Sequence, residues 1–288
     1  MLKRIINLVI SLSVGAADWL KGQVGGVLGR RPRGCCVVLA YHSVTPQERA
    51  QFARQMDVLT RCSKPIRADI QSLPGPGEDF TALTFDDGLQ CVVDNALPEL
   101  AKRGIPSTLF IVTEVLGGHP GWHNFESVDP TQEQVMSEQQ LRQLPSDLVT
   151  IGSHTMTHPV LPSVDDKRLE QELRGSREKL EKIINREVKL FSFPYGAFDE
   201  RVVEWCRETG YGRVFTALPV FALSEPQEFV TGRVGVNATD WPIEFRLKLA
   251  GAYRWLPYAY IWKRKIKSAL SGRATQDIGS KPEEERVA

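Results

Sequence analysis

Residues 81–88 read TALTFDDG, a short apolar run that ends in two adjacent acids and a glycine. The β-branched and aromatic residues of 81–85 are typical of a buried strand, and the glycine permits a sharp turn behind it. Similar runs occur at 36–41, 108–112, 149–152, 189–193 and 213–217. Segments with helical spacing separate them, at about 94–103, 165–184 and 199–209. Strand and helix thus alternate, which predicts an α/β fold with a parallel sheet or barrel.

The composition fits a globular protein with about one large domain. Of the 288 residues, 42% are hydrophobic and 25% are charged, which excludes wholesale disorder and collagen-like structure. Five cysteines, with Cys35 and Cys36 adjacent, are too few for a disulfide scaffold and favour reduced thiols. Because no stretch of about 20 residues is uniformly apolar, we expect no conventional membrane-spanning helix.

Charge is distributed unevenly, although the net charge is only +1. Residues 1–33 carry a net charge of +5, residues 246–273 carry +8 and residues 274–288 carry −2, which leaves −10 for residues 34–245. An acidic central region excludes a nucleic-acid-binding core, so we expect no nucleic acid partner. The sequence predicts four regions: a basic amphipathic N-terminal segment (1–33), an α/β barrel (34–245), a basic aromatic helical appendage (246–273) and a disordered acidic tail (274–288).

Both basic ends have apolar side chains at helical spacing, which predicts amphipathic helices that bind the surface of an anionic membrane. The alternative is that these helices pack on the domain or on each other. At the N-terminus, a charged start (1–4), an apolar run (5–14) and small residues (14–16) also match a secretory signal. We therefore expect a peripheral membrane protein, with the cytoplasmic face slightly favoured, or an exported protein if the signal interpretation holds.

Four motifs follow predicted strands, and the acids of 81–88 are the first of them. Asp86 and Asp87 alone are also typical of a turn or a helix cap. In the second motif, SHTMTHP at 153–159, His154 and His158 are four residues apart and can direct both rings to one point. Such a pair alone is equally typical of surface or capping residues. One carboxylate with two imidazoles, however, is the ligand set of a catalytic metal site with open positions.

The third motif is FSFPYG at 191–196, in which Pro194 and Gly196 bracket a tight turn. This turn can present the ring and the backbone N–H of Tyr195 to a substrate. The fourth motif is the Tyr-His-Ser that ends the first strand, where a lone histidine such as His42 is often structural. Because barrel enzymes assemble their sites at the carboxyl ends of the strands, we expect the four motifs to form one site.

TFDDG at 84–88, HTMTHP at 154–159 and FPYG at 193–196 are together far more specific than any one of them. On these residues the chain resembles the polysaccharide deacetylases of the NodB-homology type, carbohydrate esterase family 4, over about residues 36–236. The AYHSV start at 40–44 and the FPYG form are most similar to the exopolysaccharide and poly-N-acetylglucosamine deacetylase branch. The resemblance implies a distorted (β/α)7 barrel, here with basic amphipathic helical extensions at both ends.

Carried over to this chain, the resemblance implies Asp87, His154 and His158 as metal ligands. It implies Asp86 as the catalytic base and His42 as the general acid. The cofactor would be a divalent ion, Zn²⁺ first, with Co²⁺, Ni²⁺ and Mn²⁺ as alternatives.

The resemblance also implies that the backbone N–H of Tyr195, in the turn between Pro194 and Gly196, helps to hold the oxyanion. The family's third motif commonly begins with an arginine that orients the base, whereas Ser192 stands at that place here. We expect Arg233, which lies in the run TGRV at 231–234, to replace it. Trp122, on the long loop 117–136, is expected to overhang the site and contact the substrate.

The expected function is metal-dependent hydrolysis of N-acetyl groups from amino-sugar units of a polysaccharide or a lipid-linked saccharide, in cell-envelope or exopolysaccharide biosynthesis. One alternative is a deformylase or deacetylase of a lipid-carried monosaccharide. Another is a catalytically inactive glycan-binding or assembly protein on the same barrel, for which the Ser192 departure is the best support. The expected partners are an N-acetylated glycan and an anionic membrane surface, and the sequence predicts no oligomeric state.

Overall fold

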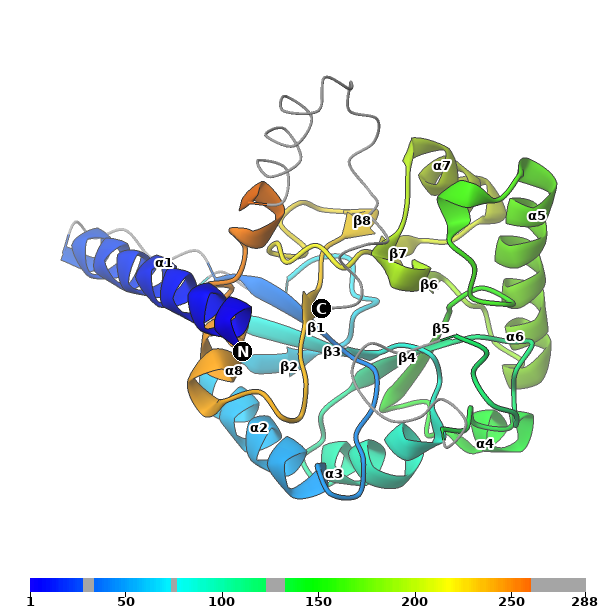
Figure 1. The fold of residues 1–288 in the computed structure, drawn as a ribbon, viewed down its shortest axis with the longest axis horizontal. Coiled ribbons are helices and arrows are strands. Elements are labelled where there is room, and N and C mark those ends of the chain that lie inside the picture. The colour runs from blue at the N-terminus through cyan, green and yellow to red at the C-terminus, as the bar shows by residue number, and fades with distance from the viewer. Residues whose placement is uncertain (28–33, 74–76, 123–132, 260–288) are drawn as a thin grey trace.

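The computed structural model describes residues 1–27, 34–73, 77–122 and 133–259, and the statements below refer to these residues. They form a parallel sheet surrounded by helices (Figure 1). The strands are β1 (Cys36–Tyr41), β2 (Lys64–Ile66), β3 (Phe80–Phe85), β4 (Ser107–Ile111), β5 (Val149–Ser153), β6 (Leu190–Ser192), β7 (Arg213–Phe215), β8 (Val230–Thr231) and β9 (Val234–Gly235). From edge to edge their order is β8-β7-β6-β5-β4-β3-β1-β9, and β2 pairs with β3 beside this path.

The first and last strands of this order are neighbours in the sequence. β8 pairs with β7, β9 pairs with β1, and Gly232 and Arg233 alone separate β8 from β9. The sheet therefore curls until its two edges come together, and β8 with β9 occupies one position of a barrel. Together with β1 and β3 to β7, this gives the seven positions of the predicted distorted (β/α)7 barrel, which is confirmed.

Helices follow the strands as the spacing predicts. α5 (Asp166–Glu170), the π-helical turn η3 (Gln171–Gly175) and α6 (Ser176–Ile184) form the predicted stretch 165–184. α7 (Glu200–Thr209) is capped by the Asp199 side chain and ends at Gly210, which has a φ of 89°. The others are α1 (Leu2–Val27), α2 (Arg49–Cys62), η1 (Val92–Ala96), α3 (Leu97–Ala101), α4 (Glu138–Gln143), η2 (Leu161–Ser163), η4 (Pro194–Gly196) and α8 (Pro242–Leu249).

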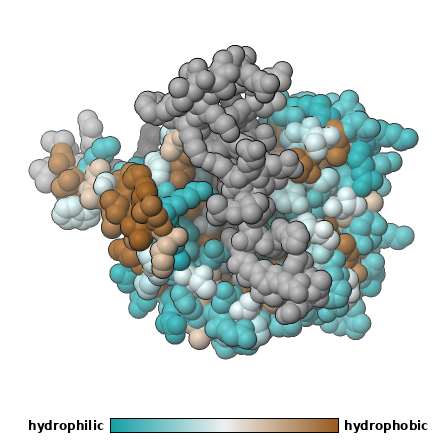
Figure 2. Space-filling view, in the orientation of Figure 1, coloured by the Kyte–Doolittle hydropathy of each residue, from teal (hydrophilic) through white to brown (hydrophobic). Residues whose placement is uncertain are grey.

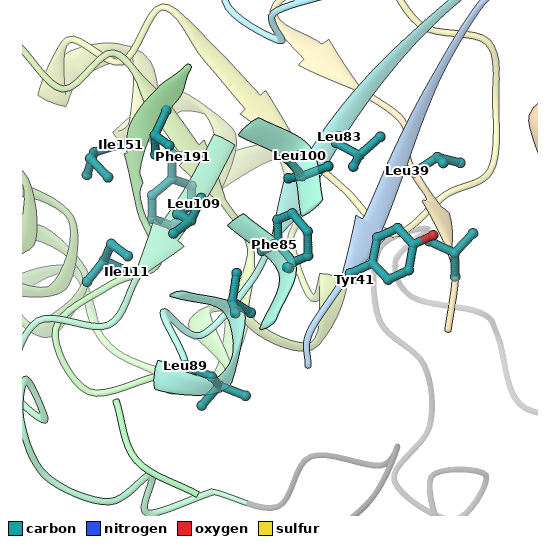
Figure 3. Close-up of a cluster of buried hydrophobic side chains, with 14 of the residues drawn as sticks. Leu39, Tyr41, Leu83, Phe85, Leu89, Leu100, Leu109, Ile111, Ile151 and Phe191 are labelled. Atoms are coloured by element: carbon teal, nitrogen blue, oxygen red, sulfur yellow. The ribbon is translucent and has the colours of Figure 1, made fainter. Parts of the chain in front are cut away.

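Alternate residues of the strands face two different clusters, because successive side chains point to opposite sides of a strand. Leu83 and Phe85 of β3 join the large cluster between sheet and helices, part of which Figure 3 shows. Phe80 and Ala82 of the same strand join the second cluster, which also includes Phe110 and Phe215. Continuing this alternation beyond Ala82 directs the polar residues Thr84 and Asp86 to the side of the second cluster.

The two ends of the chain differ from the expectation in two respects. Over Leu2–Val24, α1 has the length and mean hydropathy of a membrane-spanning helix, so the expectation of no such segment is wrong by these criteria. The charged residues of α1 lie near its ends and leave an apolar middle, so the helix is apolar on average although no run of about 20 residues is uniformly apolar. The expected boundary at residue 245 falls inside α8, which packs against α2 and α1. Of the predicted appendage 246–273, the part from residue 260 lies outside the described residues, as does the acidic tail 274–288.

Candidate metal centre and active site

Asp87, His154 and His158 lie together at the carboxyl ends of two strands. Asp87 follows β3, and the two histidines follow β5. The Nε2 atoms of His154 and His158 lie 3.6 and 3.4 Å from Oδ1 of Asp87. One ligand atom from each residue falls within 4.8 Å of the others, which is a separation that a single cation can bridge.

The donor set fits a divalent cation. Asp87 is 1% exposed, and neither of its carboxylate oxygens has a hydrogen-bond donor among the described residues. A buried carboxylate without donors is costly unless a cation compensates it. The imidazole of His154 donates from Nδ1 to the carbonyl of Ser192 at 2.7 Å, because a carbonyl only accepts, and this leaves the Nε2 lone pair for a metal. Burial holds the pKa of His158 well below its usual value, so this ring is neutral as a ligand must be.

The backbone at these strand ends adopts conformations that non-glycine residues seldom adopt. Asp87, Thr155, His158 and Tyr195 all have φ between 58° and 71°. Each such residue costs about 1–3 kcal/mol, so its surroundings must hold it in place. Gly88 also has a positive φ, of 69°, and a Cβ there would lie 2.9 Å from Cδ1 of Ile111. The strain is therefore concentrated at the turns that present the ligands.

A buried glutamate that the motifs did not reveal holds the loop between the two histidines. Glu172, in η3, is 0% exposed. Its Oε2 accepts the backbone N–H groups of Met156 and Thr157 at 2.8 and 2.9 Å, and its Oε1 accepts the Thr157 hydroxyl at 2.5 Å. Arg168 forms an ion pair with the same carboxylate at 2.7 Å. The only sequence signal for it is its spacing from Leu169, which puts an acid on the apolar side of the stretch 165–184.

Asp86 and Arg233 form a bidentate ion pair beside the metal ligands. Nη1 and Nη2 of Arg233 each donate to one carboxylate oxygen of Asp86 at 2.7 Å. Arg233 also donates to the hydroxyls of Thr84 and Ser192 and to the carbonyl of Thr216, at 3.0, 2.7 and 3.2 Å. These bonds use all five N–H groups of the guanidinium, which is 2% exposed. The structure thus places Arg233 against the acid that it was expected to orient.

The charge state of Asp86 follows from two opposing effects. Burial opposes its ionisation, but the charge and the hydrogen bonds of Arg233, together with His154 and His42, outweigh burial and hold the pKa of Asp86 far below its usual value. Ser192 also reaches this carboxylate, with its Oγ 3.3 Å from Oδ2. Ser192 therefore shares the carboxylate with Arg233.

The other predicted residues surround the same point. His42 follows β1 directly beside Asp86, because Tyr41 pairs with Phe85 and the backbone N–H of Asp86 donates to the carbonyl of Tyr41 at 2.9 Å. His42 is close enough to influence the pKa of both Asp86 and His158.

Two aromatic rings enclose His158. The ring of Trp122 stacks on that of His158 with centroids 4.4 Å apart and planes 18° from parallel. The ring of Tyr195 meets His158 edge-on at 4.5 Å, from the turn between Pro194 and Gly196. Trp122 is therefore packed on a candidate metal ligand, as well as standing on the loop that was expected to overhang the site. Pro194 is buried, and Gly196 has a φ of 64°, which allows the turn.

Comparison with known proteins assigns the family. Residues 74–214 match the model of the polysaccharide deacetylase family. This stretch of the chain is a polysaccharide deacetylase domain. The matched residues contain the acids after β3, the histidines after β5 and the turn after β6, so the gathered side chains lie within the deacetylase domain.

Relatives with known names agree with this family. YxkH of Bacillus subtilis (strain 168) is 24% identical over 162 residues, which cover 56% of this chain and 53% of that protein. The poly-beta-1,6-N-acetyl-D-glucosamine N-deacetylase of Staphylococcus aureus (strain MSSA476) is 25% identical over 134 residues, or 44% of each chain. The chain thus spans about half the length of the curated relatives it matches. The structure of IcaB from Ammonifex degensii shares the fold, with a TM-score of 0.62 and 24% identity over 77% of this chain and 98% of that one.

Proposed function

We propose that this protein is a metal-dependent hydrolase that removes N-acetyl groups from amino-sugar units of a polysaccharide or a lipid-linked saccharide. The observation that carries the proposal is the gathering of Asp87, His154 and His158 beside an acid, Asp86, that is ionised and oriented by Arg233. The S. aureus relative that deacetylates poly-beta-1,6-N-acetyl-D-glucosamine supports a polymeric N-acetylglucosamine substrate.

Each residue of the site has a task in amide hydrolysis. When bound, a divalent cation such as Zn²⁺ would lower the pKa of a water molecule from 15.7 to about 7 and polarise the amide carbonyl. Asp87, His154 and His158 hold it. Asp86, which Arg233 keeps ionised before the reaction, takes the proton of the attacking water. His42, beside Asp86 in the strand register, donates a proton to the leaving nitrogen.

The turn after β6 completes the proposal. The backbone N–H of Tyr195 is the candidate donor to the oxyanion, and the positive φ of this residue fixes its peptide plane. Preorganised donors of this kind are worth about 3–4 kcal/mol of the barrier. Trp122, whose ring stacks on that of His158, closes one side of the candidate metal ligands.

A catalytically inactive glycan-binding protein is the second candidate, since Ser192 departs from the family pattern. The position of Arg233 argues against this candidate, because it supplies a guanidinium to Asp86 from the connection between β8 and β9. Acetate release separates the active enzyme from the inactive glycan-binding protein. It is measured after the metal-loaded protein is incubated with N-acetylglucosamine oligomers and with an N-acetylated monosaccharide. Acetate release from oligomers supports the proposal, whereas oligomer binding without acetate release supports the inactive protein.

Replacing Glu172 by glutamine is expected to weaken metal binding about tenfold or more, because partners that orient metal ligands contribute 10–100-fold to affinity. The variant keeps the shape of the side chain but removes the charge that accepts the N–H groups of the loop and the Arg168 ion pair. Competition with a chromophoric chelator measures the effect. The matched control is Glu170→Gln, whose ion pair with Arg174 is about half exposed. Equal metal affinity of the two variants would show that Glu172 does not support the metal ligands.

Replacing His42 by alanine is expected to reduce turnover of an N-acetyl amide by about 10²–10⁴-fold, the usual contribution of general acid catalysis. An activated acetate ester should lose much less, because its leaving group needs no proton. The ratio of the two rates, measured with one enzyme preparation, gives the result independently of protein yield. If amide and ester lost the same factor, His42 would not be the acid.

We propose, finally, a peripheral location at an anionic membrane surface, with the cytoplasmic face slightly favoured. The basic charge of residues 1–33 and 246–273 supports it, since each basic residue near such a surface contributes about 1 kcal/mol. A substrate that is itself made or carried at a membrane would then meet the enzyme there.

A further inference from the structure

The N-terminal helix α1 is attached to the domain by its polar side. The residues of α1 that are shielded recur at 4, 7, 8, 11, 14, 15 and 18, which is one face of a helix. Arg4, Ser11 and Asp18 on this face each bond to the segment 239–255. Leu8 and Val14 are the apolar members, and they pack on a small cluster around Leu247 and Tyr253.

The attachment includes a shielded group of charges. Arg4 reaches Glu244 at 2.6 Å and lies 4.4 Å above the ring of Trp241. Glu244 and Asp240 are 5% and 4% exposed, and Lys248 pairs with Asp240 at 2.6 Å. Without Arg4, the buried carboxylates of Asp240 and Glu244 would share the ammonium group of Lys248 alone. The charges balance only when residue 4 is present.

Further along α1, Asp18 forms an ion pair with Arg254 at 2.7 Å. The indole N–H of Trp255 donates to the Ser11 hydroxyl at 2.9 Å. Gly15 allows close approach, since a Cβ there would lie 3.1 Å from Cδ2 of Leu247. Contacts from Arg4 to Asp18 hold about 21 Å of helix along the domain, at 1.5 Å a residue.

The large apolar side chains of α1 point the other way. A helix of a soluble domain turns its apolar face to the core, and here the arrangement is inverted. Figure 2 shows the apolar surface gathered over α1. Its exposed members are Leu2, Ile5, Ile6, Val9, Ile10, Leu12, Trp19, Leu20 and Val24, with exposed fractions from 36% to 73%. A contiguous apolar patch of this kind marks an interaction site.

We propose that α1 is a retained helix that lies in the plane of an anionic lipid surface, with its outward apolar face in the acyl boundary and its polar face locked to the domain. This proposal rests on the membrane location proposed above and is independent of the deacetylase activity. Lys3 and Lys21, exposed near the two ends of α1, favour anionic headgroups. The segment 260–273 carries five basic residues and no acid, and this positive charge favours binding to the same anionic lipid.

The attachment excludes two other fates of α1. A helix that spanned the bilayer would carry Asp240, Glu244, Lys248 and Arg254 into the hydrocarbon, where charges are costly. Cleavage at the small residues 14–16 would remove Arg4 and Ser11 and leave the acids around Lys248 undercompensated. An interfacial helix satisfies both the polar contacts and the apolar face.

The test is sedimentation of the full chain with vesicles of phosphatidylcholine alone and with 30% phosphatidylglycerol. We expect binding to the anionic vesicles, weakened about tenfold or more in Ile6→Asn/Val9→Asn. The matched control is Val220→Asn/Val230→Asn, two equally apolar residues that are 37% exposed on the barrel, which should bind like the wild type. Thermal unfolding of both variants verifies that they fold.

Three results would overturn the proposal. Unchanged binding of Ile6→Asn/Val9→Asn would show that another segment binds the vesicles or covers α1. A wild-type dimer that dissociates in this variant would assign the face to a second copy. Resistance of the membrane-bound protein to alkaline carbonate, or a mature N-terminus beyond residue 4 by mass spectrometry, would indicate a spanning or cleaved helix. Acetate release is measured in parallel without vesicles, so that failure of this proposal is distinguishable from failure of the enzymatic one.

Discussion

Replacing Arg233 by methionine is expected to lower the free energy of unfolding by about 3–5 kcal/mol, the cost of leaving one charge of a buried pair uncompensated. Asp86 would keep Ser192 as a partner but lose the two 2.7 Å bonds from the guanidinium. Denaturant unfolding at pH 7 measures this loss. In the double variant Asp86→Asn/Arg233→Met both charges are gone, so most of the lost stability should return.

The matched control for this experiment is Arg201→Met. Arg201 also pairs with an acid at 2.7 Å, but Asp166 is 66% exposed in its side chain. Exposed pairs contribute less than about 1 kcal/mol, so this variant should unfold nearly like the wild type. If Arg233→Met were as mild as Arg201→Met, the buried pair would not hold the site together.

The same substitution is expected to change the pH dependence of turnover. With Arg233 present, the pKa of Asp86 lies far below its usual value, so the base stays ionised at neutral pH. The stability that the ion pair contributes is lost only as the pH falls through that low pKa. Without Arg233, burial dominates and raises the pKa, so the acid limb of the pH–rate profile should move to higher pH. Arg233→Lys keeps one charge and should shift the limb less.

Replacing Asp86 by asparagine is expected to lower turnover by about 10²–10⁴-fold while one equivalent of metal remains bound. His154→Ala should lose both metal and turnover, because it removes a ligand that lies 3.6 Å from Asp87. Metal content by mass spectrometry and acetate release, measured on the same samples, separate the two roles. Wild-type turnover in Asp86→Asn would show that another group is the base.

The sequence revealed those parts of the site that lie on contiguous motifs. Asp86 and Asp87 follow an apolar run, and His154 and His158 are four residues apart, so short-range spacing was enough to propose one centre. The alternation of strands and helices likewise predicted a parallel sheet or barrel, and the resemblance implied the barrel. The roles proposed for these residues remain predictions until variants are measured.

Long-range features required the structure. Glu172 lies in the middle of an amphipathic helical stretch, and nothing in its neighbours reveals that it bonds to a loop 15 residues away. The short strands β2, β8 and β9 have two or three residues each, too few for a period to be recognised. α1 was correctly predicted as a helix, but which of its faces meets the domain depends on Asp240, Glu244 and Arg254, more than 230 residues away.

The most direct test of the central claim is the metal stoichiometry of the purified protein after loading with Zn²⁺ and removal of the excess. We expect one tightly bound equivalent in the wild type and in Asp86→Asn, and none in Asp87→Ala, His154→Ala or His158→Ala. Acetate release should follow the bound metal when a chelator strips the wild type and Zn²⁺ is returned. One tightly bound equivalent in all three ligand variants, or none in the wild type, would contradict a catalytic metal held by these residues.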